Sequence, residues 1–327
     1  MRVVITGASG FVGHGLAKFL CSHPDALGKP VSKLVLADLT PRDADQGLQG
    51  CESGEWHGGD LTDAAYLDSL LREPVDCFFH LASVPGSAAE RKPELGWSVN
   101  LSGSMALMER LARQGREGGR PPRVVFASSI AVYGVLGPGV VNEDCVPRPT
   151  ISYGAHKLMT EILLADLSRR GEIDARCLRL PGIVARPVSA SGHGSAFMSL
   201  LFHKAVAREG YVCPVSLDAT AWWMSLTTCV ANLVWAARLD PATMPSSRLW
   251  QLPVLHASVG DIVATLADHL DPESISGFRF VPDVAVESLF GRFPVLSAPG
   301  AMAAGFISDP DPSALVTQVL KGLPSPR

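Results

Sequence analysis

Residues 2–13 read RVVITGASGFVG, a short apolar run followed by three glycines spaced three residues apart. The apolar run predicts a buried β-strand, and the residues from Phe11 onward predict a helix. Gly7 permits a tight turn, Gly10 lets the backbone approach a pyrophosphate, and Gly13 lets the helix pack closely on the strand. The free N–H groups and the positive dipole end of a helix favour phosphates. The residues expected at a bound dinucleotide are therefore Gly7, Gly10, Phe11, Val12 and Gly13.

Short apolar runs alternate with helical stretches through the first half of the chain. Strand-like runs lie at residues 33–37, 75–81, 123–128 and 174–180. A stretch at 101–113 and another from Tyr153 onward carry apolar residues at helical spacing. This alternation is typical of right-handed βαβ units. We therefore expect an α/β fold: a Rossmann-type doubly wound parallel sheet with a smaller, discontinuous C-terminal substrate lobe.

Asp38 ends the second apolar run, where an acidic residue that accepts hydrogen bonds from the adenosine ribose hydroxyls is expected. Its charge would repel a 2′-phosphate, which favours NAD over NADP. Arg42 lies close in sequence and acts in the opposite sense, toward NADP. The alternative is that Asp38 is a solvated loop residue without a ligand.

Two further segments are expected to contact the cofactor. Asp60 and Leu61 follow a glycine pair and are placed to reach the adenine. Leu81 and Ala82 follow the third apolar run, at the sheet edge where ligands bind in open parallel sheets. His80, directly before them, is expected to have a structural role.

The boundaries of the two lobes follow from where this pattern holds. After Pro181, small residues and proline-rich turns replace the regular alternation. We expect an NAD-binding Rossmann domain over residues 1–182, with a returning segment near 212–240 that contains a further apolar helix. Residues 183–211 and 241–327 would form the substrate-binding lobe.

Composition narrows the class of protein. The 327 residues are 47% hydrophobic and 18% charged, as in a globular protein with a sizeable core. The net charge of −4 argues against nonspecific nucleic-acid binding. No apolar run is long enough to cross a bilayer and no leader is recognisable, so we expect a cytoplasmic protein without membrane contact. The seven cysteines show no C-x-x-C pair, which predicts free thiols and no metal site.

Tyr153 and Lys157 are four residues apart, so they share one face of a helix for which Ser152 is the expected N-cap. A tyrosine that acts as a base near neutral pH needs its phenol pKa lowered by about 3 units, worth roughly 4 kcal/mol. A neighbouring ammonium supplies this stabilisation. Ser129 ends the preceding strand, and its hydroxyl can hold a substrate oxygen in line with Tyr153. We expect these three residues to be catalytic, with Lys157 also holding the nicotinamide ribose.

These motifs resemble those of the extended short-chain dehydrogenases/reductases, the family of nucleotide-sugar epimerases, dehydratases and related dehydrogenases. The residues that carry the resemblance are Thr6 to Gly13, Asp38, Asp60, His80 to Ala82, Ser129, Tyr133-Gly134, Tyr153 and Lys157. It covers residues 1–185 strongly and the rest in outline. The resemblance implies NAD as cofactor, with Asn100 and Pro181 among its contacts. It also implies a homodimer that pairs the helices at 101–113 and 153–170.

Within the family, the chain is most similar to dehydrogenases that act on D-erythronate, a four-carbon sugar acid. The similarity rests on residues 178–181 (LRLP), 185–187 (ARP), 213–215 (CPV) and the pair Trp222-Trp223. Met224 and Leu226-Thr227 stand where that group carries a histidine and an arginine. The resemblance therefore implies a small-molecule sugar acid as substrate.

The candidate substrate-binding residues are Ser83, Ser129, Ile130, Arg186, Ser191, Gly192, His193 and Trp223. The small polar stretch at 189–195 suits a polyol, and it is equally typical of a surface loop. Arg186 could bind a carboxylate, or it could form a structural ion pair. Trp223 could form a pocket wall, although one residue of the pair Trp222-Trp223 is expected in the core.

Three alternatives to a dehydrogenase remain. A nucleotide-sugar epimerase would use the same three residues and return the hydride. A 4,6-dehydratase needs an acid–base pair beside Ser129, where Ile130 and Ala131 offer none. A dinucleotide sensor would have no need for Ser129, Tyr153 and Lys157 together.

Overall fold

Two compact units make up the chain, of which the computed structural model describes residues 1–41, 48, 54–187 and 194–323. Unit 1 comprises Met1–Gly134, Pro147–Arg179 and Val230–Gln251. Unit 2 comprises Val135–Val146, Leu180–Cys229 and Leu252–Arg327. Each unit has its own sheet and its own hydrophobic core.

A seven-stranded parallel sheet forms the centre of unit 1, with its strands in the order β11-β7-β5-β4-β1-β2-β3. The strands are β1 (Arg2–Thr6), β2 (Lys33–Asp38), β3 (Gly54–Gly58), β4 (Cys77–His80), β5 (Arg123–Ser129), β7 (Asp174–Leu180) and β11 (Leu249–Gln251). The direction of winding reverses between β1 and β4, which creates the crevice where ligands bind in such sheets. The expected α/β fold with a Rossmann-type sheet is confirmed.

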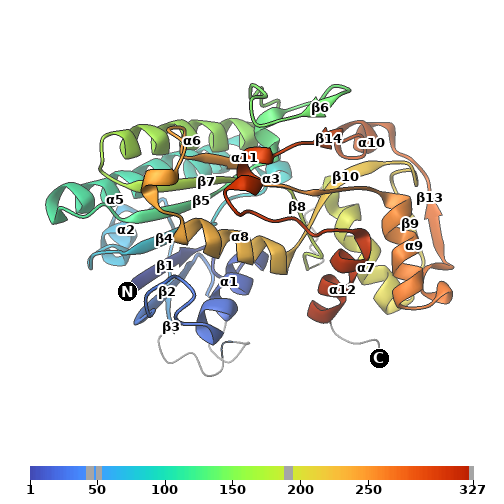
Figure 1. Cartoon of the computed structure of the whole chain (residues 1–327), viewed down its shortest axis with the longest axis horizontal. Helices are drawn as coiled ribbons and strands as arrows, with labels where there is room; N and C mark the ends of the chain where they lie inside the picture. The colour runs from blue at the N-terminus through green and yellow to red at the C-terminus, as the bar shows by residue number, and fades with distance from the viewer. Residues whose placement is uncertain (42–47, 49–53, 188–193, 324–327) are drawn as a thin grey trace. The chain divides into compact units, whose positions relative to one another are not determined.

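Helices cover both faces of this sheet. Helices α5 (Ser104–Gly118) and α6 (Ser152–Arg169) lie side by side on one face, and α1 (Phe11–Ser22) and most of α8 (Leu226–Arg238) lie on the other (Figure 1). The core under α5 and α6 is at most 1% exposed at Val4, Val35, Phe78, Leu107, Leu111, Val124, Leu164 and Leu167. Burial of each such side chain stabilises the fold by roughly 1.5–3 kcal/mol.

Arginines fix the C-terminal end of α8 to the sheet. The last carbonyl groups of a helix have no partners within it and need donors from elsewhere. Arg176 on β7 is fully buried and donates to the carbonyl oxygens of Ala236 and Leu239, each at 2.8 Å. Asp174 neutralises this guanidinium at 2.6 Å. Strand β7 and the end of α8 are therefore joined by hydrogen bonds.

Unit 2 has a three-stranded sheet in the order β12-β10-β8. Its larger elements are β8 (Gly182–Val184), β10 (Thr220–Ser225), β12 (Leu255–Ser258), α7 (Phe197–Ala207), α9 (Val259–His269), α10 (Val284–Phe290), α11 (Pro299–Ala303) and α12 (Pro312–Gly322). Two small parallel pairs join β9 (Tyr211–Cys213) to β13 (Phe278–Phe280) and β6 (Val140–Val141) to β14 (Val295–Leu296). Its core residues include Phe197, Phe202, Trp223, Ile262 and Leu315.

One expectation about the cysteines is wrong. Cys21 is disulfide-bonded, whereas seven free thiols were expected. The expectation rested on wide spacing along the sequence, but a disulfide needs only that two sulfur atoms meet in space. The other cysteines among the described residues are free, namely Cys77, Cys145, Cys177, Cys213 and Cys229.

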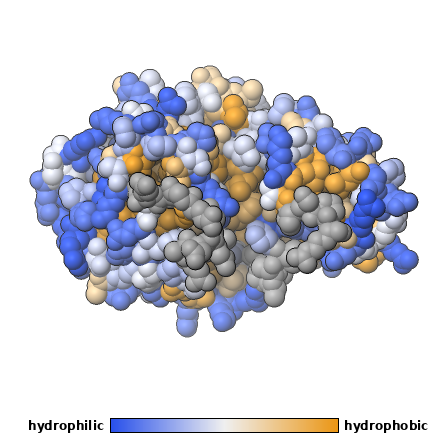
Figure 2. All heavy atoms as spheres, turned by 90° about the horizontal axis from the view of Figure 1, so that it is seen from below, coloured by the Kyte–Doolittle hydropathy of each residue, from blue (hydrophilic) through white to orange (hydrophobic). Residues whose placement is uncertain are grey.

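One face of the surface can be described by its hydropathy. On the face drawn in Figure 2, hydrophilic residues predominate and hydrophobic residues form smaller patches. Among the described residues, no helix combines the length and the apolar character that crossing a bilayer requires. The same residues contain no group of three or more potential metal ligands.

Candidate functional site

The glycine loop between β1 and α1 packs so closely on neighbouring backbone that side chains would not fit. Gly7 has a φ of +72°, and a Cβ there would lie 2.7 Å from the backbone nitrogen of Ala82. A Cβ on Gly13 would lie 2.1 Å from the carbonyl oxygen of Gly7. Helix α1 begins after Gly10, which as a glycine has no side chain to cap the N-terminus. The N-terminal N–H groups of α1 are thus left for a ligand, and the loop fits the pyrophosphate of a dinucleotide.

The acid at the end of β2 reaches this loop directly. One carboxylate oxygen of Asp38 accepts a hydrogen bond from the backbone N–H of Ser9 at 2.9 Å. The carbonyl oxygen of Asp38 accepts a hydrogen bond from the backbone N–H of Gly59 at 3.0 Å, which brings the segment with Asp60 and Leu61 alongside. Arg42 lies outside the described residues.

Hydrogen bonds fix both ends of the segment 81–84, which follows β4. The backbone N–H of Leu81 donates to the carbonyl oxygen of Thr6 at 3.2 Å, so the strand end lies beside the glycine loop. Asn100, buried in the helical segment Trp97–Gly103, accepts from the N–H of Val84 at 2.7 Å and donates to its carbonyl oxygen at 2.9 Å. The structure thus gives Asn100 the role of fixing the loop that contains Ser83.

His80 belongs to the scaffold of the site. Its two ring nitrogens lie 2.8 Å from the hydroxyl of Thr6 and 2.9 Å from the hydroxyl of Ser104. Burial, with a smaller effect of the positive charge on Lys157, lowers its pKa to about 3. A neutral imidazole that bridges two hydroxyls ties β1 to α5 and has no proton to exchange near neutral pH.

Ser129 and the start of helix α6 come together through backbone packing. Ser129 ends β5, and its hydroxyl accepts from the N–H of Ala131 in the short helix Ile130–Tyr133. A Cβ on Gly154 would lie 2.3 Å from the carbonyl oxygen of Ala131, so the first turn of α6 lies against this helix. The packing places Tyr153 and Ser129 at the same carboxyl edge of the sheet.

The expected cap of α6 is wrong. The N-cap residue is Ile151, and no side chain of the cap accepts a hydrogen bond. Instead, the carboxylate of Glu90 in helix α3 (Gly86–Arg91) accepts from the backbone N–H of Ser152 at 2.5 Å. A carboxylate at a helix N-terminus also favours the helix dipole. Glu90 thereby fixes the start of α6 next to Tyr153, and its distance along the sequence hides this role.

Lys157 is 3% exposed and lies one turn after Tyr153. Its ammonium donates to the carbonyl oxygen of Ala127 at 2.7 Å and lies 5.5 Å from the centroid of the Tyr153 ring. Burial lowers the pKa of Lys157 to about 7, and the nearby Glu161 carboxylate opposes that shift. The ammonium is therefore positioned to stabilise a phenolate at Tyr153.

The expected substrate residues lie in less defined surroundings. Arg186 donates to the Ser195 hydroxyl at 3.2 Å, and its carbonyl oxygen lies 2.7 Å from the His203 ring nitrogen. Ile130 lies in the short helix after Ser129, and Pro181 directly follows β7. Ser191, Gly192 and His193 lie outside the described residues.

The interpretation of Trp223 as a pocket wall is wrong. Its side chain is fully buried, and the indole N–H donates to the carbonyl oxygen of Ala257 at 3.0 Å. Trp222 is also buried, with its N–H donating to the carbonyl oxygen of Pro294 at 2.6 Å. Neighbouring residues of a strand point to opposite faces, and both faces of β10 are covered.

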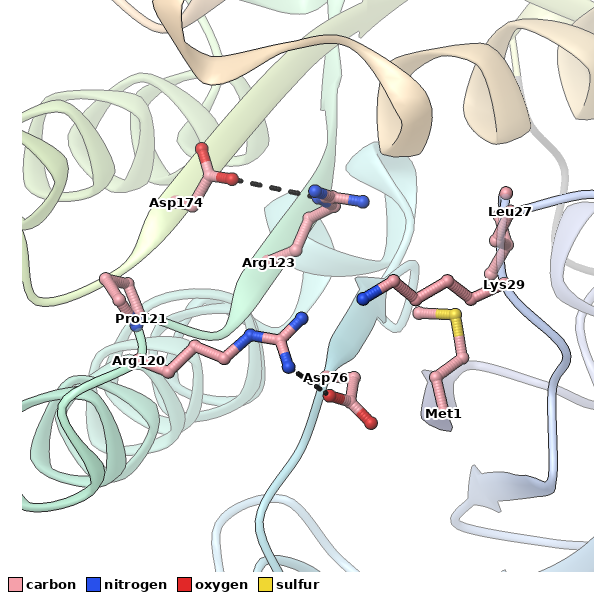
Figure 3. A pocket seen from close by; sticks show the side chains of 9 residues that line it. Met1, Leu27, Lys29, Asp76, Arg120, Pro121, Arg123 and Asp174 are labelled. Carbon is pink, nitrogen blue, oxygen red and sulfur yellow. Dashed lines mark ion pairs between the residues drawn. The ribbon is translucent and has the colours of Figure 1, made fainter.

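A cavity of about 500 Å³ lies at the opposite, amino edge of the sheet. Figure 3 shows the side chains that line it, with Arg120 paired to Asp76 at 3.5 Å and Arg123 to Asp174 at 3.7 Å. Lys29 also lines this cavity, so its three cationic side chains outnumber the two carboxylates and leave an excess of positive charge. Ser129 and Tyr153 lie at the carboxyl edge instead.

Comparisons with known proteins give similarity over almost the whole chain. The model of the NAD dependent epimerase/dehydratase family matches residues 3–238. The D-erythronate dehydrogenase of Cupriavidus necator is 35% identical over 314 residues, which are 94% of this chain and 94% of that protein. The D-erythronate dehydrogenase of Haemophilus influenzae is 29% identical over 322 residues, which are 98% and 99% of the two chains.

Solved structures with the same fold include proteins described as epimerases and as dehydrogenases. The structure of a nucleoside-diphosphate-sugar epimerase from Agrobacterium tumefaciens is similar with a TM-score of 0.90 and 29% identity, covering 97% of this chain and 92% of that one. A GalE-like L-threonine dehydrogenase from Cupriavidus necator gives a TM-score of 0.82 at 21% identity, covering 99% and 100%. The second similarity concerns the fold alone.

Proposed function

Because this chain belongs to the NAD dependent epimerase/dehydratase family, we propose that it is a dehydrogenase that oxidises a secondary hydroxyl of a small sugar acid to the keto acid. D-erythronate or a close relative is the substrate. The observation that carries the chemistry is the buried ammonium of Lys157, 5.5 Å from the ring centroid of Tyr153. Similarity to two D-erythronate dehydrogenases over more than nine-tenths of the chain supports the substrate class.

Three side chains of unit 1 perform the proton chemistry. Tyr153, as the phenolate, removes the proton from the substrate hydroxyl. Lys157 stabilises the phenolate by its charge and is itself held by the carbonyl oxygen of Ala127. Ser129 orients the reacting oxygen by a hydrogen bond. NAD supplies the hydride acceptor when it is bound.

The residues of the glycine loop would hold the cofactor. Gly7, Gly10 and Gly13 allow the loop to pack closely on the neighbouring backbone, and the start of α1 offers its N–H groups to the pyrophosphate. Asp38 would accept hydrogen bonds from the adenosine ribose hydroxyls. This carboxylate also accepts a hydrogen bond from the backbone N–H of Ser9, which holds the acid and the loop together.

A nucleotide-sugar epimerase is the second candidate. The 0.90 TM-score to the Agrobacterium tumefaciens epimerase favours it, although the two D-erythronate dehydrogenases favour the first. The purified protein with NAD should be offered four- to six-carbon aldonates beside UDP- and GDP-sugars, with absorbance and product analysis. Net NADH with an aldonate supports the dehydrogenase, whereas an isomerised nucleotide sugar without net NADH would replace it with the epimerase.

Asp38→Asn is expected to lower the preference for NAD over NADP, measured as the ratio of the two kcat/KM values, by at least about tenfold. The neutral amide loses a charge-assisted hydrogen bond to the ribose, worth about 1.5–3 kcal/mol, and no longer repels a 2′-phosphate. Asp63→Asn, at the cap of α2 (Ala64–Leu70), is the matched control and should leave the ratio unchanged. An unchanged ratio in Asp38→Asn would place the ribose elsewhere.

We also propose that the protein is a homodimer paired through α5 and α6. These adjacent helices, and the segment that leads into α5, expose large apolar side chains. They are Trp97 (57% exposed), Met105 (47%), Met159 (39%) and Ile162 (63%). Exposed large apolar side chains on neighbouring helices are typical of an interface between subunits.

Ile162→Glu is expected to convert the dimer to a monomer, because it buries a charge without a partner at the interface. Light scattering coupled to size-exclusion chromatography measures the mass. Val284→Glu, at an exposed position of α10 in unit 2, is the control and should remain dimeric. A wild-type monomer, or a dimeric Ile162→Glu protein, would contradict this interface.

Two features expected from the sequence belong to the same proposal. The first is a cytoplasmic location. The second is the assignment of residues 183–211 and 241–327 to substrate binding, with the cofactor on residues 1–182 and a returning segment near 212–240. Cell fractionation tests the location, and substrate protection in hydrogen exchange tests the assignment.

A further inference from the structure

A buried ion pair lies one helical turn beyond Lys157. Glu161, four residues after Lys157 on α6, pairs with Arg179 on β7. The two carboxylate oxygens accept from the guanidinium at 3.1 and 2.8 Å. The side chains are 5% and 4% exposed, so the pair is screened little by water.

The remaining hydrogen bonds of this pair lead to the two sides of Ser129. Ser128 directly precedes Ser129 in the chain, and its hydroxyl donates to the Glu161 carboxylate. Arg179 donates to the Tyr133 hydroxyl at 3.1 Å and lies 4.9 Å from the centroid of its ring, at the end of the helix that Ser129 begins. The cluster thus connects the catalytic helix with the segment that positions the catalytic serine.

Stability alone does not account for such a cluster. Burying two charges costs several kcal/mol per ion, and apolar side chains of similar volume often stabilise a fold equally well. An ion pair at this depth therefore calls for a role in positioning or electrostatics. Lys157 lies one helical turn before Glu161 on the same helix, so that role can apply to it.

We propose that Glu161 is a positioning residue whose carboxylate keeps Lys157 in its ammonium form, and that Arg179 orients and partly neutralises this carboxylate. The inference deepens the proposed function, and it rests on that function only for the catalytic role of Lys157. Glu161 thus maintains the positive charge of Lys157, one turn before it on α6. That charge stabilises the phenolate of Tyr153, one turn further toward the N-terminus of the helix.

The surroundings of Lys157 explain why this help is needed. Toward β5 it contacts the carbonyl oxygen of Ala127 and the face of Phe126, 4.7 Å from the ring centroid, and neither carries a charge. His80 on β4 is held neutral, with its pKa lowered to about 3. On α6 itself, the Tyr153 ring lies with its centroid 5.5 Å from the Lys157 ammonium. The negative charge of Glu161 raises the pKa of Lys157 against the effect of burial.

The charge on Lys157 can be followed without cofactor or substrate. Protein labelled with ¹³C at lysine Cε would be titrated by NMR, and the Lys157 signal assigned by its loss in Lys157→Met. Glu161→Gln removes the carboxylate and retains the shape, so the midpoint of Lys157 should fall by about one pH unit or more. Arg179→Met leaves the carboxylate without its counter-charge, so the midpoint should rise.

Shifts of the Lys157 midpoint in opposite directions in the two variants distinguish an electrostatic effect from damage to the fold. Damage to the fold does not predict a lower midpoint in Glu161→Gln and a higher one in Arg179→Met. Glu161→Gln leaves Arg179 buried without its ion-pair partner, so the double variant Glu161→Gln/Arg179→Met, free of both charges, provides a second test. Its midpoint should also lie below that of the wild type. Unchanged midpoints in Glu161→Gln and in the double variant would overturn the proposal.

The pH dependence of activity gives an independent readout. Lys157 loses its proton as the pH rises through its pKa, so a lower pKa moves the alkaline limb of the kcat profile to lower pH. Glu161→Gln should show this shift, and Arg179→Met the reverse. If the wild type has no dehydrogenase activity, the proposed function fails while the NMR titration still decides the role of Glu161.

Discussion

Tyr153→Phe is expected to lower kcat for sugar-acid oxidation by at least about a hundredfold, the usual scale for a positioned general base. The ring and its packing remain, so the loss reports the hydroxyl alone. In the structure the ring lies with its centroid 5.5 Å from the Lys157 ammonium, which is the charge that makes a phenolate accessible. Steady-state NADH formation at saturating substrate measures the effect.

Tyr211→Phe is the matched control for this change. Tyr211 lies on β9 in unit 2, and burial raises the pKa of its phenol, so it has no part in proton transfer. The control should keep kcat within about twofold of the wild type. Activity of Tyr153→Phe within a fewfold of the wild type would remove Tyr153 from the mechanism.

Lys157→Met should lower kcat by a comparable factor and at the same time stabilise the protein. Burial lowers the pKa of Lys157 from 10.5 to about 7. Below pH 7 the folded protein therefore carries a buried ammonium that the unfolded chain would hydrate, at a cost of at most about 5 kcal/mol. The lost hydrogen bond to Ala127 offsets about 1–3 kcal/mol of the gain. We expect a net stabilisation of about 2 kcal/mol at pH 6.

The pH dependence of this gain has a defined sign. Between pH 7 and 10.5 the unfolded chain retains a proton on Lys157 that the folded protein has lost, so wild-type stability rises with pH in this window. The advantage of Lys157→Met should shrink accordingly. Melting temperatures of both proteins at pH 6 and pH 9 test this. A variant that is less stable than the wild type at pH 6, or whose advantage does not change with pH, would contradict the assignment.

The strands that the sequence predicts are those buried in the middle of the sheet. Parallel strands covered on both faces consist of apolar runs, as in β1, β2, β4, β5 and β7. The two strands at the edges escape that pattern. Gly54–Gly58 reads GEWHG and is half polar, and Leu249–Gln251 spans only three residues. Edge strands bury less surface, so their sequences carry little periodic signal.

The candidate site could be predicted only where its chemistry follows the chain locally. The glycine loop and the spacing of Tyr153 and Lys157 are local patterns, and the structure places both at the carboxyl edge of the sheet. The capping of α6 by Glu90 and the pairing of Glu161 with Arg179 join distant segments. Nothing in the spacing along the sequence reveals such contacts, because tertiary packing creates them.

The pair Trp222-Trp223 illustrates a different limit. Adjacent large aromatic residues suggest one buried and one accessible face, which is the pattern of a half-exposed strand. Strand β10 is covered on both faces, and each indole N–H is satisfied by a carbonyl oxygen. Which face of a strand is covered depends on the layers around it, and the sequence of the strand alone does not determine them.

The proposed sugar-acid dehydrogenase activity is tested most directly by mixing the purified protein with NAD and D-erythronate alone. The absorbance of NADH at 340 nm is then measured. We expect sustained NADH formation, with one NADH for each molecule of keto acid produced. No net NADH with D-erythronate or its four- to six-carbon relatives, together with interconversion of a nucleotide sugar, would contradict it and identify the protein as an epimerase.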